Sequence, residues 1–206
     1  MSVATLAAFA LAGGARADGD PASDVLYTQR VFLPFESPVP KPVSSRLDTV
    51  VQRARSSGYQ IKVAVIGAPA DLGTAYALWK KPQEYARFLG QELVFLYKGP
   101  LLIVMPSGFG VYHYRHSVAV ERRALQELEV EQNGIDGLVN SAVTAVSRLA
   151  AANGHRVTVP PPAKVSDSGS GSQLVDRFII GAAGVAFVIL IIVLPVVHRR
   201  RERAAR

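Results

Sequence analysis

Two short apolar runs lie in the middle of the chain, IKVAVI at residues 61–66 and LLIVM at residues 101–105. Neither run alternates between apolar and polar residues, as a strand with one solvent-exposed face does, and β-branched residues are common in both. They therefore predict strands that are covered on both faces. The second run is followed by a turn at residues 106–108 and by the strand-like residues 109–114, which together predict a hairpin.

Segments with helical spacing separate and follow these runs. Ser44 or Ser45 is expected to cap a helix that ends at Gly58, and Pro82 fits the first turn of another helix. A charged helix is expected over residues 121–131, and the most regular helical pattern covers residues 135–152. The apolar face of this last segment is formed by Ile135, Leu138, Val139, Ala142, Val146, Leu149 and Ala150.

The start of the soluble region is expected to form a strand, first over residues 25–28 and then over residues 30–33. The proline-rich segment at residues 37–42 is expected to block both strand pairing and helix formation. This order of elements predicts an α/β fold, a small α/β/α sandwich with a mostly parallel sheet and a terminal hairpin, followed by a single transmembrane helix.

The membrane helix is predicted from residues 178–197, which hold no charged side chain. A helix needs about 20 such residues to cross the hydrocarbon core. The basic tail at residues 198–206 places the C-terminus on the cytoplasmic side. Small residues at Gly181, Ala182 and Ala186 allow a dimer of such helices as a further possibility.

The first 17 residues have an apolar stretch and an Ala-Arg-Ala ending, as in a signal peptide. We therefore expect an extracytoplasmic domain over residues 18–154 and a linker rich in Pro, Ser and Gly over residues 155–177. The predicted location is the cell membrane, with one span and with the N-terminal domain outside.

The charge and the cysteine content of the chain exclude several classes of function. The chain has no cysteine, which excludes a disulfide framework, thiolate metal sites and a cysteine nucleophile. Its formal net charge of +7 suggests a nucleic-acid partner, but five of the arginines lie in the tail after the predicted span. The basic charge thus indicates membrane topology, and we expect no nucleic-acid partner.

The order of these motifs resembles the TPM domain family. The resemblance covers residues 22–149 and rests on IKVAVIGAPADLG, KPQEYARFLGQEL and GPLLIVMPSGFGVYHY. In its Ala-, Val- and Arg-rich composition the chain is similar to membrane-anchored proteins of actinobacteria. The resemblance implies an extracytoplasmic or lumenal domain, with family roles in photosystem repair, receptor modulation or phosphatase activity. Several members bind a divalent cation through acidic residues.

This chain departs from the family at one place. Members often have an acidic Asp-Asn-Gly-like segment before the LLIVM-type strand, where this chain has Tyr97, Lys98, Gly99 and Pro100. A cation at that position would meet a lysine instead of a carboxylate. We therefore expect no cofactor, and a divalent cation is the alternative.

Few residues are candidates for a site, and no catalytic residue is assigned. Asp71 follows a predicted strand and is interpreted as a ligand or, more simply, as a helix cap. Trp79 precedes two lysines and suits contact with an anionic polymer, although it also fits an ordinary surface position. His113 belongs to an aromatic and basic cluster with His116, and the hairpin is expected to place these two on opposite faces. Asp48 and Asp71 are the candidate metal ligands.

No phosphate-binding loop and no G-x-S-x-G elbow occurs in the sequence. The favoured hypothesis is a non-enzymatic binding or envelope-maintenance module, with the lipid bilayer and an envelope protein or polymer as partners. The alternative is a divalent-metal-dependent phosphatase or another hydrolase on the outer face of the membrane.

Overall fold

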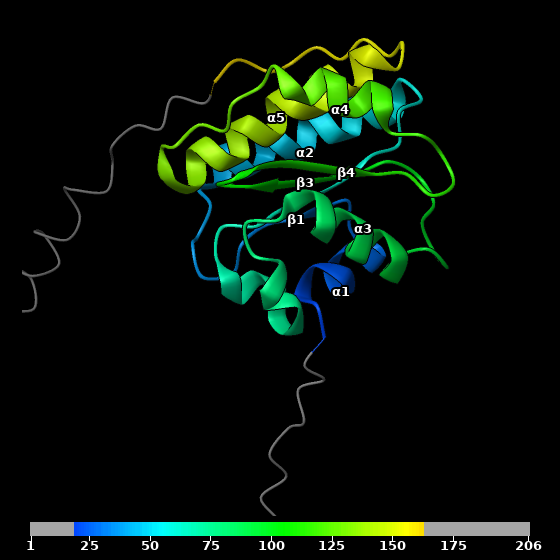
Figure 1. The fold of residues 1–206 in the computed structure, drawn as a ribbon. Coiled ribbons are helices and arrows are strands. Elements are labelled where there is room, and N and C mark those ends of the chain that lie inside the picture. The colour runs from blue at the N-terminus through cyan, green and yellow to red at the C-terminus, as the bar shows by residue number, and fades with distance from the viewer. Residues whose placement is uncertain (1–18, 163–206) are drawn as a thin grey trace, which may run out of the picture. The chain divides into compact units, whose positions relative to one another are not determined.

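The computed structural model describes residues 19–162 (Figure 1). The predicted signal peptide, membrane span and basic tail lie outside the described residues. Within residues 19–162, no helix has both the length and the apolar character that crossing a membrane requires.

A four-stranded sheet forms the centre of the described domain (Figure 1). The parallel strands β1 (Val31–Phe32), β2 (Lys62–Val65) and β3 (Leu101–Met105) lie in that order, and β4 (Gly108–Tyr112) pairs antiparallel with β3. Gly108 makes the hairpin turn at a φ of 135°, a conformation that favours glycine. The hairpin and the mostly parallel sheet agree with the sequence prediction.

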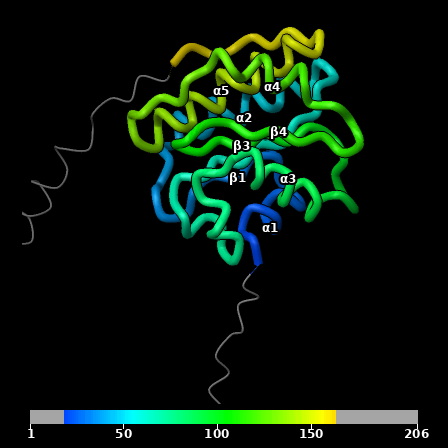
Figure 2. The backbone as a smooth tube through the Cα atoms, in the orientation of Figure 1, coloured from blue at the N-terminus to red at the C-terminus, as the bar shows by residue number. Residues whose placement is uncertain are grey.

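Helices cover both faces of this sheet (Figures 1 and 2). One layer contains α2 (Lys41–Ser56), α4 (Ala119–Gln126) and α5 (Gly134–Ala152), packed on the face that carries Val63 and Val104. The other contains α1 (Pro21–Thr28), the 3-10 helix η1 (Pro69–Leu78) and α3 (Pro82–Glu92), packed on the face that carries Ala64 and Ile103. Because neighbouring residues of a strand point to opposite faces, β2 and β3 each contribute to both cores.

The two crossovers of the parallel strands have opposite hands. The chain steps in one direction from β1 to β2 to β3, but α2 covers one face of the sheet while η1 and α3 cover the other. Two crossovers of the same hand would place their helices on the same face. One crossover is therefore left-handed, an arrangement found in only about 2% of such connections.

Most of the predicted elements occur where the sequence placed them. The strands at residues 61–66 and 101–105, the helix that opens at Pro82 and the final long helix are confirmed within a residue or two at each end. In α5, all the predicted face residues except the half-buried Ile135 are buried. These are the elements with the longest apolar runs or the most regular helical spacing.

The predicted strand over residues 25–28 is wrong, because these residues belong to α1. Asp20 caps the helix by accepting a hydrogen bond from the Ala22 N–H at 3.3 Å, and Pro21 occupies the first turn. Burial of Ala22 and Leu26 against the sheet stabilises the helix. The cap and the following proline were the signal for a helix start that the strand-like composition concealed.

Three further boundaries differ from the prediction. Helix α2 begins at Lys41 with Pro42 in its first turn, so neither Ser44 nor Ser45 is its cap and the proline-rich segment does not block the helix. Helix α4 ends at Gln126 instead of continuing to residue 131. The 3-10 helix η1 was not predicted, since its residues lack a regular apolar stripe.

The segment that follows α5 is held against α2. Arg46 donates a hydrogen bond from Nε to the Pro160 carbonyl at 3.0 Å, and Arg53 donates to the Thr158 carbonyl at 2.7 Å. Val157 and Val159 pack against the core between these contacts. The first residues of the expected linker are therefore attached to the domain as far as Pro160.

Candidate functional site

A cleft of about 260 Å³ lies at the carboxyl ends of the parallel strands. Ser37 reaches it from the loop after β1, Gly67 from the loop after β2, and Pro106 from the end of β3. Glu131, Gln132, Gly134, Ile135 and Leu138 complete the lining from the start of α5 and the segment before it. Glu131 is charged, and the other lining residues are neutral.

The topology of the sheet explains why the cleft forms here. The chain leaves β1 toward the α2 layer and leaves β2 toward the layer of η1 and α3. Neighbouring strands whose connections diverge to opposite faces leave a crevice at their carboxyl ends, which is where ligands bind in open α/β sheets. In this chain the change of crossover hand creates the crevice, without a reversal of strand order.

Asp71 connects the two diverging loops. Its Oδ2 accepts hydrogen bonds from the Gly67 N–H at 2.8 Å and the Ala68 N–H at 2.9 Å, and its Oδ1 accepts one from the Phe35 N–H at 3.1 Å. The residue is only 1% exposed. Because its two oxygens already accept three backbone hydrogen bonds, the Asp71 side chain fixes the shape of the cleft wall.

The opposite wall of the cleft is held by Ser141. The Ser141 hydroxyl accepts a hydrogen bond from the Glu131 N–H at 2.8 Å and donates one to the Gly137 carbonyl at 2.9 Å. A Cβ on Gly137 would lie 2.7 Å from the Glu131 carbonyl oxygen, so only glycine permits this close approach. Glu131 is thereby fixed at the rim of the cleft although its side chain is exposed.

An exposed aromatic residue, Phe35, lies in the loop between β1 and α2, two residues before the cleft residue Ser37. The side chain of Phe35 is 63% exposed, while its N–H is bound to Asp71 and its ring makes an edge contact with Phe32 at 5.2 Å. The backbone of Phe35 is therefore held in place while most of its ring faces solvent. Exposed aromatic rings held in this way are typical of the energetically important residues of protein interfaces.

The other candidate metal ligand lies apart from Asp71. Asp48 is an exposed residue of α2, in the layer on the opposite face of the sheet from η1. Partial desolvation raises the pKa of its carboxyl, and the charge of Lys41 opposes this. Among residues 19–162, no group of three or more His, Asp or Glu side chains is arranged to hold a metal ion.

Trp79 does not line the cleft either. It follows η1, is half-buried, and packs against the core of the η1 and α3 layer. The next residue, Lys80, has a φ of 63° and so occupies the left-handed region. Part of the indole is thus used for packing, which leaves the neighbouring Lys80 and Lys81 as the exposed charges of this turn.

His113 lies at the other edge of the sheet, where it lines a larger cleft of about 510 Å³ with Tyr59, Tyr97 and His155. The expectation that His113 and His116 point to opposite faces is wrong, because their rings stack with centroids 4.2 Å apart. Strand β4 ends at Tyr112, and the chain then turns so that the His116 N–H meets the His113 carbonyl. Burial, and then the charge of His116, lower the pKa of His113.

Two buried polar pairs were not found from the sequence. Tyr85 donates a hydrogen bond to Asp20 Oδ1 at 2.7 Å, and burial raises the pKa of Asp20 to about 6. Glu121 is buried, although it was expected on a charged helix, and its charge adds to the burial that raises the pKa of Tyr59. The partners are separated by 65 residues in the first pair and by about as many in the second, so sequence spacing gives no signal.

The fold and the cleft together define a three-layer α/β domain with a small cleft at the carboxyl edge of its sheet. No protein-family model, no curated protein and no solved structure matches the chain in comparisons with known proteins.

Proposed function

We propose that the chain is a single-pass membrane protein whose extracytoplasmic, TPM-like domain binds a partner at the carboxyl-edge cleft. The observation that carries the proposal is the cleft where the connections after β1 and β2 diverge, braced by Asp71, with the exposed Phe35 in the same loop as the lining residue Ser37. The sequence of residues 178–206 supports the membrane anchor, because an uncharged segment long enough to span is followed by clustered arginines.

The size and lining of the cleft favour binding over catalysis. A volume of about 260 Å³ lies below the usual range of roughly 300–1,000 Å³ for small-molecule sites. The lining contains one hydroxyl and one carboxylate and no histidine or lysine, so no nucleophile is paired with a base. Such a cleft suits a protruding side chain of an envelope protein or polymer, and Glu131 favours a positively charged one.

The absence of natural cysteine makes a direct test possible. A photoreactive maleimide attached to Ser37→Cys in the full-length chain should cross-link to a partner in intact membranes. The same reagent at Thr144→Cys, an exposed position in the middle of α5, is the matched control. A defined cross-linked species with Ser37→Cys alone supports the proposal, and identical products from both positions contradict it.

The exposed ring gives an independent test. Phe35→Ala should weaken capture of the cross-linked partner by about tenfold or more, as truncation of a central aromatic contact does. Phe95→Ala, at a position that is 93% exposed near the other edge of the sheet, should leave capture unchanged. Equal effects of the two substitutions would show that the cleft is not the point of contact.

The hydrolase alternative is tested by a phosphatase assay on the full-length protein with Mg²⁺ or Ca²⁺. The binding proposal predicts no metal-dependent turnover. Turnover that is lost in Asp48→Asn would favour the hydrolase, because this exposed substitution does not disturb the fold.

A further inference from the structure

A small pocket lined by cations lies at the amino edge of the sheet, opposite the proposed binding cleft. It has a volume of about 160 Å³ and is lined in part by Arg30, Arg55, Lys62 and Tyr97, with no carboxylate in its lining. This volume lies well below the roughly 300–1,000 Å³ of sites for drug-sized ligands. The pocket therefore suits a single small anionic group such as a phosphate.

The two arginines of this pocket are exposed, and neither forms a salt bridge or a side-chain hydrogen bond within residues 19–162. Lys62, in contrast, donates from Nζ to the carbonyls of Leu26 and Gln29 and so joins the end of α1 to β2. Burial, and then the charge of Arg30, lower the pKa of Lys62. Cations gathered without a carboxylate are electrostatically complementary to an anion.

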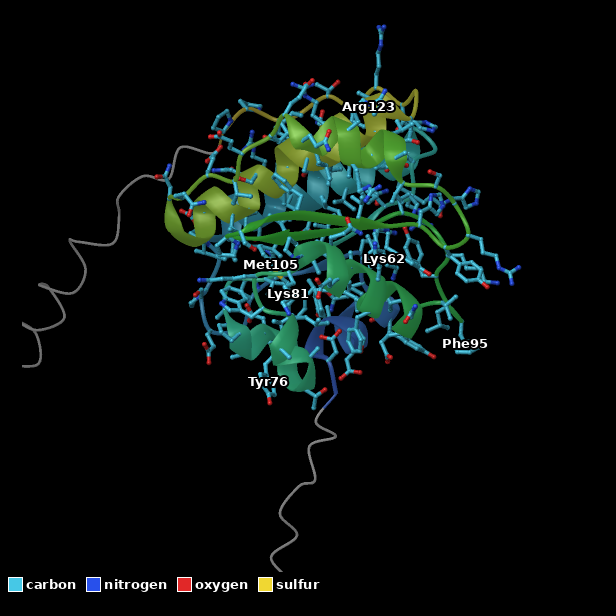
Figure 3. All side chains as sticks on the ribbon, in the orientation of Figure 1. Lys62, Tyr76, Lys81, Phe95, Met105 and Arg123 are labelled. Carbon is cyan, nitrogen blue, oxygen red and sulfur yellow. The ribbon has the colours of Figure 1, made fainter. Side chains whose placement is uncertain are left out.

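A pair of exposed apolar side chains lies next to the pocket. Phe95 is 93% exposed and Leu96 is 52% exposed, and Figure 3 shows Phe95 pointing away from the domain on the same side as Lys62. The next residue, Tyr97, is fixed because its hydroxyl hydrogen bonds to the Pro100 carbonyl at 2.7 Å. Phe95 and Leu96 are thus presented by a loop that is anchored immediately beside the basic pocket.

Two more cations extend the basic character of this edge. Lys98 Nζ lies 5.7 Å from the centre of the Tyr114 ring, and the Arg115 guanidinium lies 5.2 Å from the same ring. The ring therefore joins the loop after α3 to the loop after β4. Aromatic and aliphatic side chains beside Lys and Arg are the composition of surfaces that enter the headgroup region of a bilayer.

We propose that this amino edge is a docking surface for an anionic phospholipid bilayer. A headgroup phosphate occupies the pocket between Arg30 and Arg55, while Phe95 and Leu96 enter the interfacial region. The opposite edge carries the exposed Glu36 and Glu131 together with Lys41, so it lacks the cluster of cations without a carboxylate that lines the pocket at the amino edge. The docked domain then presents its carboxyl-edge cleft away from the membrane.

The chain between the domain and the predicted span is long enough for this orientation. Residues 163–177 reach at most about 50 Å at 3.3–3.6 Å per residue. A domain of this size has a radius of gyration of only about 15 Å. The proposed docking surface and the proposed cleft lie at opposite edges of the sheet. Either proposal can therefore fail without the other.

The test uses the full-length protein in nanodiscs, with an environment-sensitive NBD fluorophore on Leu96→Cys. The discs contain either phosphatidylcholine alone or equal parts of phosphatidylglycerol and phosphatidylcholine, with a nitroxide-labelled phospholipid as quencher. We expect a blue shift and quenching in the anionic discs and little of either in the neutral discs. The same fluorophore on Ser37→Cys should show the emission of a solvent-exposed probe in both kinds of disc.

Substitutions identify the groups responsible. Arg30→Gln and Arg55→Gln should each lower the ratio of docked to undocked protein about fivefold, the factor expected for one basic residue at an anionic surface. Arg123→Gln is the matched control, because this exposed arginine of α4 does not line the pocket and extends outward from the domain (Figure 3). Phe95→Ala should reduce quenching, and Phe35→Ala should not.

Three results would overturn the proposal: equal quenching in neutral and anionic discs, quenching at Ser37→Cys instead of Leu96→Cys, or an effect of Arg123→Gln as large as that of Arg30→Gln. A fluorophore at residue 96 that stays in water in both discs would also overturn it, and would direct attention to an acidic protein partner. Unchanged thermal unfolding of each variant verifies that these results do not come from misfolding.

Discussion

Asp71 shows how a single carboxylate can shape a binding cleft without touching a ligand. It lies where the sequence suggested a ligand or a cap, and the structure places three backbone N–H groups around its two oxygens. One of these, from Phe35, is 36 residues away in the chain. The position of Asp71 was therefore predictable, but its connection between two loops was not.

Replacing Asp71 with Asn should destabilise the domain. The amide group puts a donor where a carboxylate oxygen now accepts from backbone N–H groups, which leaves a buried donor unpaired. We expect the free energy of unfolding to fall by about 3 kcal/mol in urea denaturation. Asp48→Asn, on the exposed face of α2, should change it by less than about 0.5 kcal/mol. Equal effects would contradict the structural role of Asp71.

Asp20 should make stability depend on pH. Its pKa of about 6 in the folded protein lies above the unfolded value of 3.8, so the folded state binds the proton more tightly. This contribution to stability is complete below pH 3.8, falls as the pH rises, and is lost above about pH 6. The loss amounts to about 3 kcal/mol.

Asp20→Asn keeps the capping oxygen and removes the titration. The variant should unfold at the same temperature as the parent near pH 4 and at a higher temperature at pH 8, because no buried charge forms. Thermal melts of both proteins across this range give the comparison. If the melting temperatures of the two proteins change in parallel with pH, then the pKa of Asp20 does not differ between the folded and unfolded states.

Among the elements, those with a continuous pattern were predictable and those defined by distant contacts were not. Strands β2 and β3 are apolar throughout and α5 has a regular stripe, so their patterns indicate their structure directly. Helix α1 has a strand-like composition and becomes helical through its cap and its packing on the sheet. The stacked pair His113 and His116 depends on where β4 ends, which no local pattern marks.

The packing of α3 on β4 depends on glycine. A Cβ on Gly110 would lie 2.0 Å from the Pro82 carbonyl oxygen, so any larger residue forces the helix away from the strand. We expect Gly110→Ala to lower the free energy of unfolding by about 3 kcal/mol or more. Gly134→Ala has open space around it but a φ of 64°, and should cost only about 1 kcal/mol. Denaturant titrations that give equal losses would contradict this packing.

For the described domain as a whole, sheet topology and charge give the two edges of the sheet different characters. The change of crossover hand places a cleft at the carboxyl edge, and Arg30 and Arg55 give the amino edge a basic character. From the sequence, the layers and the hairpin were predictable, whereas the left-handed crossover was not, because patterns along the chain carry no information about hand. The cleft itself is assembled from loops far apart in sequence and depends on that hand.

The claim that a partner occupies the carboxyl-edge cleft can be tested by the rate of maleimide modification at Ser37→Cys. The full-length variant is labelled with a membrane-impermeant maleimide in intact native membranes and again after purification, with Thr144→Cys, at an exposed position in the middle of α5, as the reference. We predict that Ser37→Cys reacts more slowly in membranes than when purified, while Thr144→Cys reacts equally in both. Equal rates at Ser37→Cys in the two settings would contradict the claim.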